Sequence, residues 1–438
     1  MNLMNRDLLK LRIDLSPSDS IKQNPQLKAA IDKLFYNNTS GNLGDVVLPE
    51  RKLDFTEVNL ILKKTPDTKD LEKTPDMVIK ETREKRKHII NKIEQILDGI
   101  NTSADDGEAP RLIIRNQKLW SNCIYDMDRV TLKNISNAKT SIVRSNGEER
   151  SRFNTIVFVL SKVHELVVKN LTVTRRELYY QKLQRFRNQV ELDVAVRDVC
   201  CLLETPPWEL GIVATAKGLI AGPLQIVNRD GSVIDCMTPG GTIIPQDING
   251  VKQLKSSAKY ILVVEKDAIF QKLLDEGALV RLSPVIMITG KGYPDVCTRQ
   301  LLCLLVSELK LPALALVDAD PHGYEIFLTY KYGSLAQSHL SSSLACPKLL
   351  LLGSRIQDVL TLAPTSSRLP LNTRDKRKLN ALIKRPYLHT VIGLKIKEEL
   401  VSMLEFGIKA EIESLASSAS VLCDSYLPSK IIQSDYLG

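Results

Sequence analysis

The sequence lacks the cysteine and histidine patterns of a disulfide-linked or zinc-binding protein. Its eight cysteines are scattered and form no Cys-x-x-Cys pair, and its five histidines do not cluster with them. In a chain of 438 residues, this pattern argues against a disulfide framework and against a zinc site. We therefore expect a protein of a reducing compartment.

Long apolar runs are also missing. No stretch of about eighteen uninterrupted apolar residues occurs, which is the length needed to span a membrane as a helix. The first residues, Met1 to Asp7, lack the apolar core of a signal peptide. The sequence also contains no P-loop. We expect an intracellular protein with no membrane partner and no ATP site of its own.

The composition is otherwise that of a soluble globular protein, with 43% hydrophobic and 25% charged residues. The length suffices for two or three domains with full cores. Lysine and arginine outnumber aspartate and glutamate by 60 to 51, which gives a formal net charge of +9. This excess suits an anionic partner such as nucleic acid, although many basic proteins have none.

Composition shifts along the chain predict three parts. Residues 1–105 form a polar N-terminal extension with one helix, at about residues 78–97, and the first 80 residues are expected to be flexible. Residues 106–252 form a compact α+β unit. Residues 253–438 form an α/β unit with C-terminal helices. An apparent linker near residues 250–256 separates the last two units.

The most informative short stretch contains two adjacent tyrosines. Thr174 and Glu177 fit the Thr-x-x-Glu capping box, which predicts that a helix begins at Arg175. Tyr179 shares one face of that helix with apolar residues at offsets of four, seven and eleven: Leu183, Phe186 and Val190. Tyr179 is therefore expected to be part of the core.

Tyr180 points about 100° away from Tyr179 on the same helix. Its neighbours at helical spacing are polar and mostly cationic: Arg176, Glu177, Gln184 and Arg187. A tyrosine with a pKa of about 10 is a poor nucleophile near neutral pH, but an adjacent arginine stabilises the phenolate and can hold a phosphate. Taken alone, the stretch fits two packed tyrosines and solvated arginines better than a catalytic site.

The remainder of residues 106–252 predicts a winged-helix module. Helices are expected at residues 153–168, at the tyrosine stretch and at residues 192–203. Strands at residues 224–228 and 232–236 are joined by a hairpin turn. Three helices followed by a hairpin are typical of a DNA-binding winged helix. Before the hairpin, glycines near Lys217 allow close backbone approach, and Lys217 is placed to meet a phosphate.

From residue 259 the pattern changes to apolar strands that alternate with helices. The strands are expected at residues 260–264, 284–288, 313–317 and 348–352. Continuous apolar strands of this kind predict a parallel sheet covered on both faces. The fold class is therefore mixed, α/β and α+β, in more than one domain.

Three acidic residues follow two of these strands. Glu265 comes directly after the first, and Asp318 and Asp320 come after the third. Ligands in open α/β sheets bind beyond the carboxyl ends of the strands, so the three carboxylates are expected at one edge. One acid after a strand is usually a loop or capping residue. The set of three instead offers the hard oxygen ligands that Mg²⁺ prefers.

These pieces together resemble the A subunit of the type IIB topoisomerase (topoisomerase VI) and its relative, the meiotic double-strand-break transesterase. The resemblance runs from about residue 91 to residue 436. It is carried in order by Arg176-Glu177-Leu178-Tyr179-Tyr180, Lys217-Gly218-Leu219-Ile220-Ala221-Gly222, Val263-Val264-Glu265-Lys266, Gly290-Lys291-Gly292-Tyr293-Pro294-Asp295, Asp318-Ala319-Asp320-Pro321-His322-Gly323 and Gly407-Ile408-Lys409-Ala410-Glu411-Ile412-Glu413. Glu177 stands where many meiotic members carry aspartate.

The resemblance implies a catalytic-activator-like winged helix followed by a Toprim domain. It makes Tyr180 the nucleophile and places Arg176 near the scissile phosphate. It also implies the following further roles: Glu265, Asp318 and Asp320 as Mg²⁺ ligands, and Lys217, Lys291 and Tyr293 near bound DNA. The polar first 80 residues lie outside the shared region, so the resemblance implies nothing about them.

The implied function is metal-dependent cleavage of double-stranded DNA through a covalent 5′-phosphotyrosyl intermediate, which initiates meiotic recombination on chromosomes in the nucleus. The implied assembly is a homodimer or pseudo-dimer, and a further implied partner is a B-like subunit of the topoisomerase VI type. One alternative is that the chain belongs to a resealing topoisomerase, as its A subunit beside an ATPase B subunit. A non-catalytic DNA-binding scaffold is another.

Overall fold

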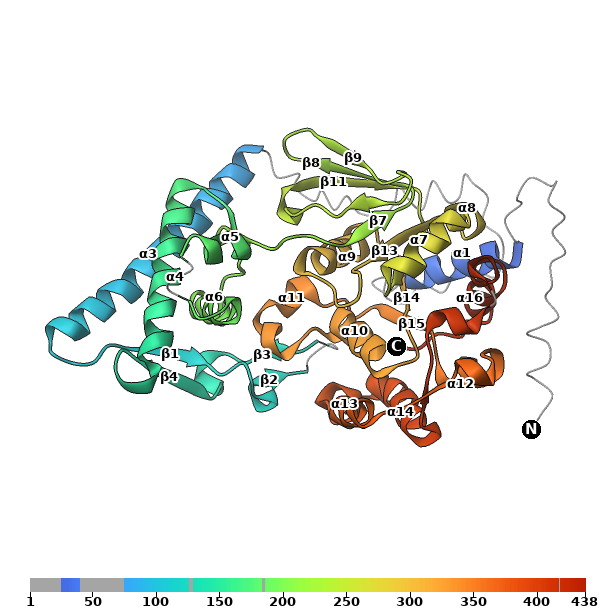
Figure 1. Ribbon diagram of the computed structural model, residues 1–438. Coiled ribbons are helices and arrows are strands. Elements are labelled where there is room, and N and C mark those ends of the chain that lie inside the picture. Colours follow the sequence, from blue (N-terminus) through green and yellow to red (C-terminus); the bar gives the residue numbers. More distant parts are fainter. Residues whose placement is uncertain (1–24, 40–74, 126–128, 183–185, 417) are drawn as a thin grey trace, which may run out of the picture.

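A computed structural model describes residues 25–39, 75–125, 129–182, 186–416 and 418–438. Two lobes are visible in Figure 1, one built from the helices α3 to α6 and the other built around a central sheet. No helix within these residues is long and apolar enough to cross a membrane.

The first lobe is a small helical bundle closed by a strand pair. Its helices are α3 (Pro75–Asp105), α4 (Arg150–Lys169), α5 (Arg175–Tyr180) and α6 (Gln189–Leu203). The antiparallel pair is β1 (Arg111–Arg115) with β4 (Thr140–Arg144). Along α4 the buried residues recur at helical spacing, for example Ile156, Val159, Leu160 and Val163, so this helix lies at the centre of the lobe.

Short strands complete the first lobe and connect it to the second. They are β2 (Cys123–Ile124), β3 (Thr131–Leu132), β5 (Val173–Thr174) and β6 (Ile212–Val213). β5 and β6 run parallel, and β5 leads directly into α5. The start of the tyrosine helix is therefore fixed by a strand pair.

The second lobe contains a six-stranded sheet in the order β10-β7-β13-β12-β14-β15. Four strands are parallel, namely β12 (Tyr260–Val264), β13 (Val285–Thr289), β14 (Ala313–Leu316) and β15 (Leu349–Gly353). They match the four predicted strands to within a residue or two, so the predicted parallel sheet is confirmed. β7 (Leu219–Ala221) and β10 (Thr242–Ile243) extend one edge in the antiparallel sense.

Both faces of the sheet are covered. Along β12, Ile261 and Val263 belong to one buried cluster, while Leu262 and Val264 belong to the other. Alternate side chains of a strand point to opposite faces, so these are the two sides of one sheet. The helices that surround the sheet are α7 (Asp267–Asp275), α8 (Ala278–Arg281), α9 (Val296–Glu308), α10 (Pro321–Tyr332), α11 (Ser341–Leu344), α12 (Ile356–Leu362), α13 (Thr373–Ile383), α14 (Val391–Phe406), α15 (Ala419–Val421) and α16 (Leu427–Ile432). A further strand pair, β16 (Leu369–Pro370) with β17 (Ile408–Lys409), lies in the C-terminal region.

The predicted hairpin is present, but it packs in the second lobe. β8 (Leu224–Asn228) and β9 (Val233–Asp235) pair antiparallel, and β11 (Val251–Ser256) pairs with the other side of β8. Leu224 and Ile226 are buried in the core of the large sheet, not against the three helices. The apparent linker at residues 250–256 was wrong, because these residues form β11.

The N-terminal part contains a second helix that the sequence patterns did not reveal. The expectation of one helix in residues 1–105 was wrong, since α1 (Pro25–Thr39) precedes α3. Leu27, Ile31 and Leu34 form an apolar stripe that packs into the same core as α16. Figure 1 shows α1 beside α16, far from the first lobe. Residues 1–24 and 40–74, also expected to be flexible, lie outside the described residues.

We predict that Ile31→Ala lowers the free energy of unfolding of the second lobe by about 2–3 kcal/mol, because it leaves a cavity under a docked helix. Ile31 is 1% exposed. The measurement is a thermal unfolding scan against Lys28→Ala, which changes an exposed position of the same helix. Equal unfolding temperatures for the two variants would show that α1 does not contribute to the core.

Candidate active site

The tyrosine helix begins as predicted and ends sooner than predicted. The capping box is complete, because the Glu177 N–H donates to Thr174 Oγ1 (3.1 Å) and the Thr174 N–H donates to the Glu177 carboxylate (3.4 Å). α5 then stops at Tyr180 after six residues. The expected continuation to Val190 is wrong, since a turn follows and Asn188 caps a new helix, α6. Leu183 and Gln184 lie outside the described residues.

The two tyrosines of α5 have different surroundings. The Tyr179 ring is half-buried and packs on Phe186, with ring centroids 6.0 Å apart. Tyr180 is 59% exposed and touches the edge of Tyr179, at 5.6 Å between centroids. Arg176 is exposed and lies one helical turn before Tyr180, so both side chains share a face. The predicted difference between the tyrosines holds, although the helix is short.

The first turn of α5 faces a loop of the second lobe. A cavity of about 450 Å³ is lined by Arg175 and Arg176 on one side and by Pro294 and Asp295 on the other. Arg175 pairs with Asp193 of α6 across 3.6 Å. One arginine therefore anchors the helix, while Arg176 is left at the surface of the cavity.

Glu265 and Asp318 meet at the carboxyl edge of the sheet, as predicted. They follow the neighbouring strands β12 and β14 and are 8% and 5% exposed. The Asp318 backbone N–H donates to Glu265 Oε2 (2.8 Å), and the Ile412 N–H donates to Asp318 Oδ1 (2.9 Å). Burial raises the pKa of both carboxyls, and the charge of Asp318 raises the pKa of Glu265 further. Negative charge on these two carboxyls is therefore unfavourable unless a positive group offsets it.

Asp320 lies beside this pair and caps α10. Its Oδ1 accepts hydrogen bonds from the N–H groups of His322 (2.9 Å) and Gly323 (2.6 Å). Its charge also contributes to the raised pKa of Glu265, so the three acids share one electrostatic environment. Within the described part of the chain, however, no three His, Cys, Asp or Glu side chains are gathered closely enough to hold a metal ion.

The chemistry of the acids nevertheless fits Mg²⁺. The donors are carboxylate oxygens, which this hard cation prefers. Glu265 and Asp318 are buried, and a divalent ion would relieve the repulsion among the three acids. A positive group already occupies part of the site, because Lys266 Nζ lies 2.9 Å from Asp318 Oδ2. A divalent ion would therefore meet this ammonium at Asp318.

Lys217 and Lys291, both predicted to lie near DNA, are in direct contact. Asp295 Oδ2 accepts the N–H groups of Lys217 (2.9 Å) and Gly218 (3.2 Å). Lys217 Nζ donates to the Lys291 carbonyl oxygen (3.3 Å). Lys291 also has a left-handed φ of 52°. Lys291 Nζ itself pairs with Asp267 Oδ2 (3.0 Å), so two segments far apart in sequence meet in one corner that contains both lysines and two aspartates.

Tyr293 belongs to the same loop and is held by residues that the sequence did not single out. Its hydroxyl donates to Glu325 of α10 and accepts from Lys378 Nζ of α13 (3.0 Å). Burial alone would raise the pKa of Glu325, but Lys378, Tyr293 and Arg385 outweigh it and lower that pKa to about 2. The one sequence signal for this anchor was the basic run at residues 374–378, which resembles an ordinary solvated face.

The structure does not bring Tyr180 to the acids. In the ranges that the structure describes, no hydrogen bond, ion pair or ring contact joins Tyr180 to Glu265, Asp318 or Asp320. Figure 1 shows α5 in the first lobe, apart from the strands that position the acids. Tyr180 and the acids of one chain are therefore separate features.

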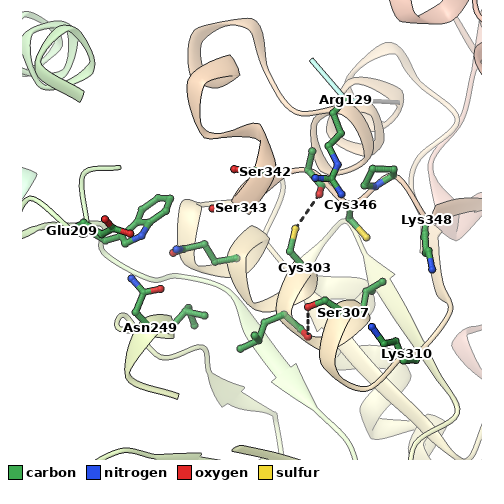
Figure 2. A pocket seen from close by; sticks show the side chains of 17 residues that line it. Arg129, Glu209, Asn249, Cys303, Ser307, Lys310, Ser342, Ser343, Cys346 and Lys348 are labelled. Atoms are coloured by element: carbon green, nitrogen blue, oxygen red, sulfur yellow. Dashed lines mark hydrogen bonds between the residues drawn. The ribbon is translucent and has the colours of Figure 1, made fainter. Parts of the chain in front are cut away.

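A cavity of about 540 Å³ lies elsewhere (Figure 2). Lys310 and Lys348, which precede β14 and β15, line it, so it lies at the amino ends of these strands. Its Cys303 Sγ donates to the Ala345 carbonyl oxygen (3.3 Å). The acids follow the carboxyl ends of the strands, so this cavity is not part of their site.

Two family models match the regions that contain these features. The model of the Toprim domain shared by Spo11 and the A subunit of topoisomerase 6 matches residues 260–431, which include all three acids. The type IIB DNA topoisomerase model matches residues 151–212, which include Tyr180 and Arg176. The Toprim domain is a metal-binding fold. These matches define the class, a topoisomerase-like transesterase of type IIB.

Curated relatives place the chain within that class. It is 38% identical to the human meiotic recombination protein SPO11 over 348 residues, which cover 78% of this chain and 87% of that protein. It is 34% identical to the Drosophila melanogaster meiotic recombination protein W68, covering 72% and 93%. It is 36% identical to the A subunit of Arabidopsis thaliana DNA topoisomerase 6, covering 72% and 74%. The chain belongs to the family of Spo11 and the topoisomerase VI A subunits.

We predict that Gly323→Ala damages the acid site. A Cβ at this position would lie 2.5 Å from the Asp318 carbonyl oxygen and 2.9 Å from Glu265 Oε2, so the backbone must shift at a cost of about 1–3 kcal/mol. DNA cleavage by the variant should fall at least tenfold, by analogy with other small misplacements of catalytic groups.

The control for this substitution is Gly99→Ala in α3, where nothing lies within 4 Å of the added carbon. That variant should cleave DNA like the unaltered chain. Cleavage by Gly323→Ala at the unaltered rate would show that the acids tolerate displacement of the α10 start.

Proposed function

We propose that this chain makes double-strand breaks in DNA by tyrosine transesterification and so initiates meiotic recombination. The observation that carries the proposal is the contrast within α5, where Tyr179 is packed and Tyr180 is exposed on the same face as Arg176. Membership of the family and the names of the meiotic relatives also support the proposal.

In the proposed reaction the Tyr180 oxygen attacks a backbone phosphorus. A phosphorus–oxygen bond to tyrosine forms, the bond to the 3′ oxygen breaks, and that oxygen takes up a proton. The products are a 5′-phosphotyrosyl link and a free 3′-hydroxyl. One phosphodiester replaces another, so the cleavage step needs no ATP.

Each site residue has a proposed role. Arg176, one turn before Tyr180, pairs with the scissile phosphate and favours the phenolate. Glu265, Asp318 and Asp320 hold Mg²⁺, which when bound supplies positive charge against the charge that develops on the phosphate. Lys217, Lys291 and Tyr293 contact the DNA backbone beside the acids.

The proposed assembly is a homodimer or pseudo-dimer with composite sites. Tyr180 and the acids of one chain lie in different lobes, which supports a site shared between two chains. Double-stranded DNA is the substrate, a topoisomerase VI B-like subunit is a further partner, and the chromosomes in the nucleus are the place of action. We also propose a division of the chain into three parts, residues 1–105, 106–252 and 253–438. The second boundary falls within β11, which begins at residue 251.

The A subunit of a resealing topoisomerase is the second candidate. The match to the A subunit of Arabidopsis thaliana DNA topoisomerase 6 favours it. The two candidates share the cleavage chemistry and differ in religation. A non-catalytic scaffold has less support, because every proposed catalytic residue is present.

We predict that Tyr180→Phe abolishes covalent attachment to DNA, because only the attacking oxygen is lost. DNA binding, measured in parallel by a gel-shift assay, should remain. Tyr179→Phe is the matched control and should still form the adduct, which is detected as labelled DNA that stays with denatured protein. An adduct mapped to Tyr179 by peptide mass spectrometry would overturn the assignment.

We predict that cleavage activity is shared between chains. Tyr180→Phe and Asp318→Ala chains should each be inactive alone. In a mixture, the Tyr180 of one chain meets the intact acids of the other, so one strand of a duplex is nicked. A nicked-circle assay measures this outcome. If no mixture recovers any cleavage, each site is built from one chain.

A further inference from the structure

The C-terminal segment 407–413 lies along the acid edge of the sheet. The Ala410 N–H donates to the Ala319 carbonyl oxygen (3.1 Å), and these residues form an isolated antiparallel bridge. Two residues further on, the Ile412 N–H donates to Asp318 Oδ1 (2.9 Å). This segment belongs to the stretches that carry the family resemblance, yet no role follows from that resemblance.

The segment surrounds one cation together with Asp318. Lys266 Nζ lies 2.9 Å from Asp318 Oδ2, 3.3 Å from Glu411 Oε2 and 3.5 Å from Glu413 Oε2. The side chains of Lys266 and Asp318 are 28% and 8% exposed, whereas those of Glu411 and Glu413 are 62% and 34% exposed. One ammonium therefore lies between the carboxylate of a buried side chain and those of two more exposed side chains.

We propose that Lys266 is a positioning residue that neutralises Asp318 before metal binding, and that Glu411 and Glu413 receive its ammonium when a divalent cation takes Asp318. This inference rests on the proposed function, in which Asp318 is a metal ligand. It adds a role for three residues outside the proposed ligand set.

The contacts support such a transfer. A divalent ion at Asp318 and an ammonium at the same carboxylate would repel each other at close range in a partly buried site. The Lys266 stem is flexible, and its three N–H donors rotate freely, so the ammonium can change partners without backbone movement. Glu413 Oε2 is buried and accepts no hydrogen bond among the described residues, and Lys266 Nζ already lies 3.5 Å from it, so a small movement of the ammonium would complete a hydrogen bond there.

The experiment measures thermal unfolding of the full chain, without DNA, over a range of Mg²⁺ concentrations. Binding to the folded state raises the unfolding temperature, so the concentration for half of the maximal shift reports relative affinity. Lys266→Met and Lys266→Gln should each lower that concentration by about tenfold, because the competing charge is gone. Lys409→Met, which removes a lysine paired with Asp375, should leave it within about threefold.

The Glu411→Gln/Glu413→Gln double variant should have the opposite effect and raise the half-maximal concentration by about threefold or more, because the displaced ammonium has lost its acceptors. Glu405→Gln, at an exposed position of α14, is the matched control and should have no effect. Combined with Lys266→Met, the double variant should cause no further change, because its effect depends on the lysine.

The variant that combines Lys266→Met with both glutamate substitutions distinguishes transfer of the ammonium from a direct effect of the glutamates. If the glutamate substitutions weaken Mg²⁺ binding equally without Lys266, they act as ligands or through the general field, and the transfer is wrong. An unchanged or weaker affinity in both Lys266 variants also overturns it. Asp318→Ala tests the proposed function separately, since that variant should lose the Mg²⁺-dependent shift whatever residue stands at position 266.

Discussion

The carboxylate of Asp318 is the point on which the second lobe depends. One of its oxygens accepts the Ile412 N–H, the other pairs with Lys266, and its own backbone N–H donates to Glu265. These contacts join two neighbouring strands and a segment almost a hundred residues further along the chain. A buried carboxylate is stable only when its oxygens are satisfied, so the fold and the acid site are held by the same bonds.

Much of this architecture could be predicted from the sequence. The strands that precede Glu265 and Asp318 are continuous apolar runs, and the end of such a run fixes where the next polar residue lies. The start of α5 was predictable for a similar reason, since a capping box is a local pattern with a local cause. Features decided within a few residues of each other were predicted well.

Features that depend on partners far away in the sequence were not predicted. The apolar spacing from Tyr179 to Val190 predicts one long helix, but Asn188 caps a new one and Phe186 reaches Tyr179 from beyond the turn. The hairpin was predicted correctly, yet β8 pairs with β11 and buries Leu224 and Ile226 in the core of the second lobe instead of against the three helices. Lys266 and Glu411 could not be joined from sequence, because only the closed fold places them at one carboxylate.

Because α1 packs into the core of the second lobe, the N-terminal residues cannot all be removed without consequence. The composition of the first 80 residues predicts a flexible extension. A shortened chain that begins where the family models match, at residue 151, would leave them out. Such a shortening would strip Leu27, Ile31 and Leu34 from the core that they share with α16. The uncovered apolar surface would then be open to self-association. Part of the N-terminal region, α1, thus covers apolar surface of the second lobe, and its removal would be seen first as poor solubility.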